Sequence, residues 1–136
     1  MSKNTFETQI RVRYGETDQM GFVYYGNYAL YLEQARTEML RSVGYTYKEM
    51  EEKGVLLPVV NMDTRFIGSG KYDDLLTIRT YIKGIPNRKI IFYTEIFNEQ
   101  EELLNKSEVI LVFMNPKGKV ISCPQDILDS LKKFVQ

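Results

Sequence analysis

Apolar and polar residues follow one another along this chain with a period that changes from segment to segment. Between Phe6 and Tyr14 the alternation has a period of two, with Ile10, Val12 and Tyr14 on one side, which predicts a half-buried strand. From Tyr28 to Val43 the apolar residues instead recur every three or four positions, as in an amphipathic helix. Such a helix would be about 24 Å long, enough to cross a small domain.

The predicted long helix has recognisable ends. Asn27 is a residue type that caps helix N-termini, and Gly44 is a typical C-terminal stop. Thr46, with Glu49 at the capping-box spacing, predicts a short second helix that ends at Gly54. The long helix should bury one stripe, formed by Tyr28, Tyr31, Leu32, Ala35, Met39 and Val43, and expose another, formed by Glu33, Gln34, Arg36, Thr37, Glu38 and Arg41. Three-residue spacing predicts surface ion pairs between Glu33 and Arg36 and between Glu38 and Arg41.

The second half of the chain is rich in strand-forming residues. It predicts strands over Val55–Ile67, Leu75–Ile82, Lys89–Phe97 and Leu103–Met114, with turn-forming residues between them. Pro124 is suited to the start of a last helix. One long helix and a succession of hairpins predict an α+β fold, in which residues 1–136 form a single domain and the helix covers one face of an antiparallel sheet.

Composition narrows the classes of function. The 136 residues carry 18 Lys and Arg against 18 Asp and Glu, so neither general nucleic-acid binding nor binding to a membrane surface is expected. A single cysteine, Cys123, excludes a disulfide within the chain and fits a reducing compartment. The N-terminal residues lack the apolar core of a signal peptide, and no apolar run is long enough for a membrane helix. We therefore expect a cytoplasmic protein that does not insert into a membrane.

The chain contains no histidine. This absence excludes Ser-His-Asp and Cys-His catalysis, and with one cysteine it argues against zinc and most transition-metal sites. We expect neither a metal nor a cofactor. Proton transfer at neutral pH must then use Asp, Glu, Lys, Tyr, Cys123 or water.

Several segments together resemble the hotdog-fold acyl-CoA thioesterases, the group of 4-hydroxybenzoyl-CoA thioesterase and the YbgC-type enzymes. They are Tyr14–Asp18, Gly21–Tyr25, Asn27–Tyr28 and Glu33–Arg41, with weaker matches at Tyr72–Leu76 and Leu104–Val109. The resemblance covers nearly the whole chain and implies a curved antiparallel sheet wrapped around the long helix. It also implies an acyl-CoA substrate, so that coenzyme A is part of the substrate and not a separate cofactor. The subunits would associate as a homodimer or as a homotetramer built from two dimers, with the active sites between subunits.

The same resemblance implies roles for residues around the start of the helix. Asp18 is at the position of the family's catalytic carboxylate, and the backbone N–H near Tyr25 is at that of the group that polarises the thioester carbonyl. YbgC-type members typically carry histidine where this chain has Tyr25. Tyr14 joins these two as a candidate catalytic residue, and the candidate substrate-binding residues here are Gly21, Tyr24 and Asn27.

The residues themselves are compatible with this chemistry. A thioester needs an attacking oxygen and stabilisation of the charge that develops on its carbonyl oxygen, and a helix N-terminus offers free N–H groups. Asp18 could attack directly or act as general base on water, and it could also be an ordinary turn aspartate. We interpret Glu16 as a solvated loop residue. The tyrosines could form an acyl pocket or pack the core and an interface; we favour packing for Tyr28 and Tyr31.

Coenzyme A carries several phosphate charges, which basic residues should meet. Asn87, Arg88 and Lys89, close to Lys83, lie at a predicted turn and resemble family positions that touch the coenzyme A moiety. A solvated hairpin end is the alternative.

Other functions remain open from the sequence. An acyl carrier protein could replace coenzyme A, since both present the same phosphopantetheine arm. A non-catalytic acyl-binding hotdog module is a second alternative. A hotdog dehydratase ranks lower, because such enzymes typically use histidine.

Overall fold

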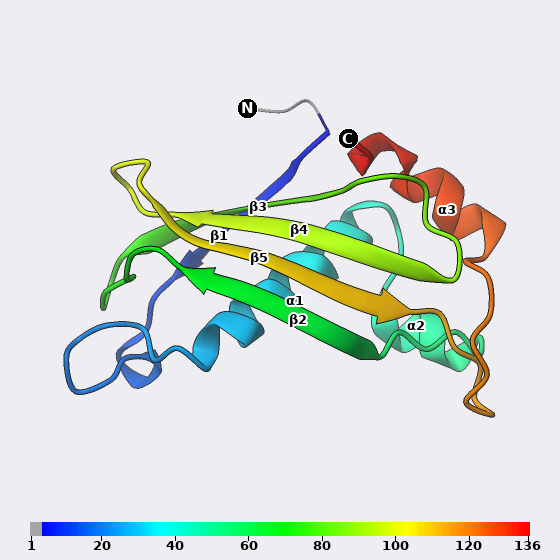
Figure 1. Cartoon of the computed structure of the whole chain (residues 1–136), viewed down its shortest axis with the longest axis horizontal. Helices are drawn as coiled ribbons and strands as arrows, with labels where there is room; N and C mark the ends of the chain where they lie inside the picture. Colours follow the sequence, from blue (N-terminus) through cyan, green and yellow to red (C-terminus); the bar gives the residue numbers. More distant parts are fainter. Residues whose placement is uncertain (1–3) are drawn as a thin grey trace.

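A computed structural model of the chain describes residues 4–136. Five strands and three α-helices follow one another (Figure 1) in the order β1 Phe6–Arg11, α1 Asn27–Ser42, α2 Tyr47–Glu52, β2 Val59–Phe66, β3 Leu75–Ile82, β4 Lys89–Phe97, β5 Leu103–Val112 and α3 Gln125–Leu131. Short 3-10 turns cover Tyr14–Glu16 and Lys132–Phe134. The α+β prediction is therefore confirmed, and the predicted limits of β3 and β4 are those observed.

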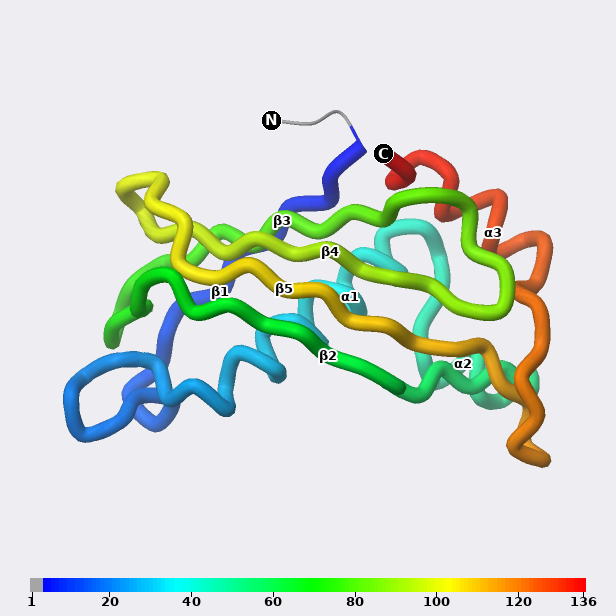
Figure 2. Tube along the Cα trace, viewed as in Figure 1, coloured from blue at the N-terminus to red at the C-terminus, as the bar shows by residue number. Residues whose placement is uncertain are grey.

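The strands form one antiparallel sheet in the order β1-β3-β4-β5-β2. Figure 2 shows them curving side by side across α1, which lies behind the sheet. β1 and β2 are the two edges. β2 leaves large apolar side chains exposed, with Val60 57% and Phe66 50% accessible, although apolar edge strands are usually covered.

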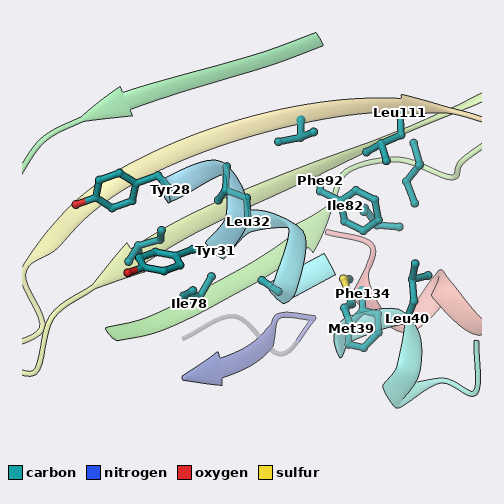
Figure 3. Close-up of a cluster of buried hydrophobic side chains, with 14 of the residues drawn as sticks. Tyr28, Tyr31, Leu32, Met39, Leu40, Ile78, Ile82, Phe92, Leu111 and Phe134 are labelled. Carbon is teal, nitrogen blue, oxygen red and sulfur yellow. The ribbon is translucent and has the colours of Figure 1, made fainter. Parts of the chain in front are cut away.

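The core lies between α1 and the covered face of the sheet. Tyr28, Tyr31, Leu32, Ala35 and Met39 are all at most 3% exposed, as the predicted stripe required. Figure 3 shows the two tyrosines and Leu32 among side chains from the sheet. In β3 and β4 every second residue is buried, so the period-two pattern there marks the face that packs against the helix.

Arg36 contradicts the predicted polar face of α1. It is only 6% exposed and makes no ion pair within residues 4–136, whereas Glu38 and Arg41 pair at 3.5 Å as predicted. A position at the border of an apolar stripe can turn inward when the neighbouring elements cover it, and spacing alone does not reveal that cover.

The start of the chain corrects two further predictions. β1 ends at Arg11, and the 3-10 turn at Tyr14 leaves that side chain 79% exposed instead of beside Ile10 and Val12. Asn27 is the first residue of α1 and not its cap; the cap is Gly26, without a side-chain hydrogen bond.

The helix ends that follow were predicted correctly. Gly44 has φ of +94° directly after the C-cap Val43, a conformation that favours glycine. The Thr46 hydroxyl accepts a hydrogen bond from the Glu49 amide at 3.1 Å and caps α2. At the other end of the chain, β5 stops at Val112, two residues before its predicted limit.

Two negative findings concern residues 4–136. No helix there is both long and apolar enough to cross a membrane. The same residues contain no group of three or more potential metal ligands.

Candidate active site

The segment between β1 and α1 is a small antiparallel hairpin. Thr17 bridges Val23, the Asp18 amide donates to the Phe22 carbonyl oxygen at 2.7 Å, and the Tyr24 amide donates to the Glu16 carbonyl oxygen at 2.9 Å. This pairing folds the chain back on itself, so that Asp18 lies on the hairpin whose second arm runs directly into α1.

The Asp18 carboxylate is held by the turn at the hairpin's tip. Its Oδ1 accepts hydrogen bonds from the Met20 amide at 2.9 Å and from the Phe22 amide at 3.2 Å. Gly21, with φ of +82°, supplies the left-handed conformation that closes the turn. Asp18 is thus a turn aspartate, which was the alternative considered from the sequence. Its other oxygen, Oδ2, accepts no hydrogen bond from residues 4–136, which leaves it free to react.

Free N–H groups lie at the start of α1. The Asn27 amide donates to the Tyr24 carbonyl at 2.8 Å and the Tyr28 amide to that of Tyr25 at 3.3 Å. The amides of Tyr25 and Gly26 have no such acceptor in the described chain. These two donors therefore remain available to an oxygen atom placed before the helix.

Glu16 is not the solvated residue predicted from the sequence. Its Oε1 accepts from the Arg13 amide and from the Tyr31 hydroxyl, both at 2.9 Å, and its Oε2 pairs with the Arg13 guanidinium at 2.8 Å. Partial burial raises the pKa of this carboxyl, but the hydrogen bonds from Arg13 and Tyr31 outweigh burial and lower it below its usual value. Glu16 thus ties the hairpin to the buried side of α1.

Asn27 strengthens the same attachment. Its side-chain amide donates to the Glu16 carbonyl oxygen at 2.9 Å. The residue expected to bind substrate therefore also holds the hairpin against the helix, and its contact with substrate stays a prediction.

A second support for the hairpin comes from the segment before β3, which sequence reasoning treated as a plain connector. The Gly70 carbonyl accepts from the Val23 amide at 2.8 Å, and the Gly70 amide donates to the Tyr28 hydroxyl at 3.1 Å. A Cβ at Gly70 would come within 3.1 Å of the Val23 side chain. The glycine was the available signal, because close backbone packing is one of its uses.

The tyrosines divide into two groups. Tyr28 and Tyr31 are buried, which confirms their packing role, whereas Tyr24 and Tyr25 are 48% and 66% exposed. The ring of Tyr25 lies 6.3 Å from that of Phe66 at the end of β2. An exposed aromatic surface thus joins the hairpin to the sheet edge. Tyr14 lies outside this contact, with its ring 5.6 Å from that of Tyr72.

Asn87, Arg88 and Lys89 are not brought together with Asp18. They are exposed at the turn between β3 and β4, across the molecule from the hairpin in Figure 1. β3 begins next to Val12, because the Val12 amide donates to the carbonyl oxygen of Asp74 at 2.9 Å. From there the eight residues of β3 extend about 25 Å to the turn that carries Arg88. In one chain, Asp18 and this basic turn therefore lie near opposite ends of β3.

Comparison with known proteins agrees with this geometry. The family model of the thioesterase-like superfamily matches residues 12–131. The chain belongs to this superfamily. The match includes the hairpin, α1 and every strand except β1, so the hotdog arrangement expected from the sequence is confirmed.

Individual relatives extend along most of the chain. The acyl-CoA thioester hydrolase YbgC of Escherichia coli O157:H7 is 32% identical over 98% of this chain and 100% of its own length. YneP of Bacillus subtilis (strain 168) is 37% identical over 73% of this chain and 72% of its own. The solved DHNA-CoA thioesterase from Staphylococcus aureus superposes with a TM-score of 0.81 at 30% identity, covering 90% of this chain and 81% of that one.

Proposed function

We propose that this protein hydrolyses acyl-CoA thioesters to a carboxylic acid and coenzyme A. The observation that carries the proposal is that the hairpin leading into α1 leaves two kinds of group unengaged: one carboxylate oxygen, Oδ2 of Asp18, and the N–H groups before the helix. These are the two elements that thioester hydrolysis requires: an attacking or proton-accepting oxygen, and donors for the developing oxyanion. The names of its relatives support the same reaction class.

Two routes use the same atoms. In the first, Oδ2 of Asp18 attacks the thioester carbon, the C–S bond breaks, and water then hydrolyses the mixed anhydride. In the second, Oδ2 takes a proton from water as the water attacks. In both, the amides of Tyr25 and Gly26 receive the carbonyl oxygen, a contribution on the order of 10²–10³ in rate. The hydrogen bonds to Oδ1 keep the carboxylate oriented throughout.

A second copy of the chain would complete the site. β2 is an edge strand with exposed Val60, Met62 and Phe66, and antiparallel pairing of two such edges around a two-fold axis would cover them. Val59 of one copy would then lie opposite the Phe66 end of the other. The Asp18 of each copy would then lie near the end of the partner's sheet that carries the basic turn at Arg88.

This arrangement explains the separation of the candidate residues in one chain. The reacting carboxylate and the turn that would meet the coenzyme A phosphates come from different subunits in the proposed homodimer. Further association to a dimer of dimers, a cytoplasmic location and independent folding of residues 1–136 as one domain remain predictions from the sequence.

The test is release of free thiol from a panel of acyl-CoA esters by the wild type and by Asp18→Asn. The amide keeps an oxygen for the Met20 and Phe22 amides, so the fold should survive while kcat falls by about 10³-fold or more. Asp73→Asn is the matched control, since Asp73 is an exposed residue with φ of +70°, which Asn tolerates. Comparable turnover by Asp18→Asn and the wild type would refute the assignment.

The same panel separates the alternatives. Turnover of acyl carrier protein thioesters alone would identify the carrier, and binding of acyl-CoA with no thiol release would favour the non-catalytic module.

A further inference from the structure

Tyr28 has a hydroxyl that packing alone does not account for. The residue lies in the first turn of α1 and is only 3% exposed. Figure 3 shows its hydroxyl at the outer end of the buried cluster, pointing away from the other labelled side chains. There it accepts a hydrogen bond from the Gly70 amide at 3.1 Å. Phenylalanine would fill nearly the same space without a hydroxyl that has to be satisfied, so the bond to Gly70 indicates a second role for this residue.

One set of contacts leads from this hydroxyl to Asp18. The Gly70 carbonyl oxygen accepts from the Val23 amide at 2.8 Å, so one polar group of this glycine is bonded to the helix and the other to the hairpin. Val23 bridges Thr17, which directly precedes Asp18, and the Asp18 amide donates to the Phe22 carbonyl oxygen at 2.7 Å. The hairpin that carries the carboxylate is therefore fixed to the buried side of α1 through a single glycine residue.

A second set of contacts leads from the Tyr28 ring to the N–H donors before the helix. The ring lies 5.7 Å from that of Phe66, which in turn lies 6.3 Å from the ring of Tyr25. Both pairs have the edge-to-face arrangement that aromatic rings prefer. The amide of Tyr25 is one of the two that would receive the carbonyl oxygen. Tyr28 thus supports both the carboxylate and the donors.

Close packing makes the link through Gly70 stiff. A Cβ at this position would lie 3.1 Å from the Val23 side chain and 3.4 Å from that of Leu76, a residue of β3 that is fully buried. The glycine therefore has neighbours on both the hairpin and the sheet, and a displacement of the phenol is passed on to the hairpin. Rates respond strongly to such displacements, since a misplacement of about 1 Å can cost on the order of 10²-fold.

We propose that Tyr28 is a positioning residue, whose hydroxyl acts through Gly70 to set the place of the Asp18 carboxylate relative to the amides of Tyr25 and Gly26. The phenol itself is buried and touches no reacting atom, so its loss should lower kcat and leave KM nearly unchanged. The inference rests on the proposed function for the reaction, whereas the attachment of the hairpin can be measured without any reaction.

Tyr28→Phe tests the inference, because it keeps the ring and its contact with Phe66 and removes only the hydroxyl. The Gly70 amide then lacks its acceptor. For thiol release from the best acyl-CoA ester, kcat should fall by about tenfold or more while KM changes by less than about twofold. Hydrogen exchange of the amides of Val23 and Asp18, both hydrogen-bonded within this attachment, should become about tenfold faster. A kcat equal to that of the wild type would overturn the inference.

Ile127→Val is the matched control for a general loss of stability. Ile127 is buried in α3, at the other end of the molecule from the hairpin in Figure 1. Loss of one buried methylene there destabilises a protein about as much as loss of one hydrogen bond. This variant should match Tyr28→Phe in urea unfolding and keep the wild-type kcat and hairpin exchange. An equal fall of kcat in both variants would contradict a positioning role.

Gly70→Ala tests the route by which the hydroxyl acts. The added methyl group crowds Val23, so this variant should also lower kcat, by about tenfold. Because both changes disturb the same link, the kcat of the double variant with Tyr28→Phe should lie within about twofold of that of the slower single variant. Losses that multiply would show that the hydroxyl does not act through Gly70 and would overturn the inference.

The exchange measurement separates this inference from the proposed function. If the wild type hydrolyses none of the esters but exchange at Val23 and Asp18 rises in Tyr28→Phe and not in Ile127→Val, the reaction is wrong and the attachment by Tyr28 stands. If the wild type hydrolyses an ester and Tyr28→Phe does so equally fast, the reaction stands and the positioning role is wrong. Absence of both hydrolysis and a change in exchange contradicts both.

Discussion

Glu16 offers a sharp test of how the hairpin is attached to the helix. Its carboxylate accepts from the Arg13 amide and the Tyr31 hydroxyl at 2.9 Å each, and hydrogen bonds to a charged group contribute about 1.5–3 kcal/mol apiece. The Arg13 guanidinium is exposed to solvent, so its ion pair adds little. Because the two contacts share one oxygen and are partly solvated, we expect Glu16→Ala to lower the free energy of unfolding by about 2–3 kcal/mol. Glu16→Gln, which keeps an acceptor oxygen, should lose about half of that.

The pH dependence of stability supplies an independent measure. The pKa of Glu16 is lower in the folded chain than its usual value of about 4.3. As the pH falls, the Glu16 carboxylate is therefore protonated in the unfolded chain before it is protonated in the folded chain. The contribution of Glu16 to the free energy of unfolding is complete above its usual pKa and is lost as the pH falls through its lower pKa in the folded chain. The wild type should begin to lose this contribution as the pH falls below about 5, and Glu16→Ala should lack this pH dependence.

The assay is urea unfolding at fixed protein concentration, since association would also affect the midpoint. The variants Glu16→Ala and Tyr31→Phe, with the double variant, form a double-mutant cycle. This cycle isolates the hydrogen bond between Glu16 and Tyr31, for which we expect a coupling free energy of about 1 kcal/mol. A loss below about 0.5 kcal/mol in Glu16→Ala, with the wild-type pH profile retained, would refute the reasoning.

The remaining predictions concern the turn, the sheet edge and the buried arginine. Gly21→Ala should destabilise the turn by about 1 kcal/mol in urea unfolding and lower kcat for thiol release, because φ is +82° there. Gly15→Ala, which has no atom within 4 Å of the added Cβ, should change neither the stability nor kcat. Met62→Lys places a charge on the exposed edge of β2 and should yield a smaller species in sedimentation, and an unchanged mass would contradict edge pairing. Arg36→Met removes a buried guanidinium that makes no ion pair within residues 4–136, and it should leave the free energy of unfolding unchanged or raise it by up to about 2 kcal/mol; a large loss in urea unfolding would mean that the hydrogen bonds of this guanidinium stabilise the fold.

Part of this molecule follows from local rules. The limits of β3 and β4, the C-terminal glycine of α1 and the Thr46 cap depend on residues within a few positions of one another, and the sequence predicted them correctly. Tyr28, Tyr31 and Met39 were predicted to be buried because a helix repeats every 3.6 residues whatever surrounds it. Asp18 was chosen through a resemblance and not through any property of its own spacing.

Other features depend on contacts between distant segments. Glu16 is bonded to Tyr31, fifteen positions away, and Gly70 to Tyr28, forty-two positions away. No local pattern predicts either contact, since both arise only when the hairpin, α1 and the segment before β3 meet. For this reason Glu16, which the sequence predicted to be solvated, attaches the hairpin to α1, and the segment around Gly70, which the sequence predicted to be a connector, supports the hairpin.

The sequence by itself determined the elements of this protein and the chemical type of its candidate catalytic residue, because periodicity and the absence of histidine are properties of the chain alone. Only the tertiary structure decided which atoms remain free: Oδ2 of Asp18 and the amides at the start of α1. Whether a polar atom is satisfied depends on every segment that folds against it, and neither its residue type nor its spacing carries that information.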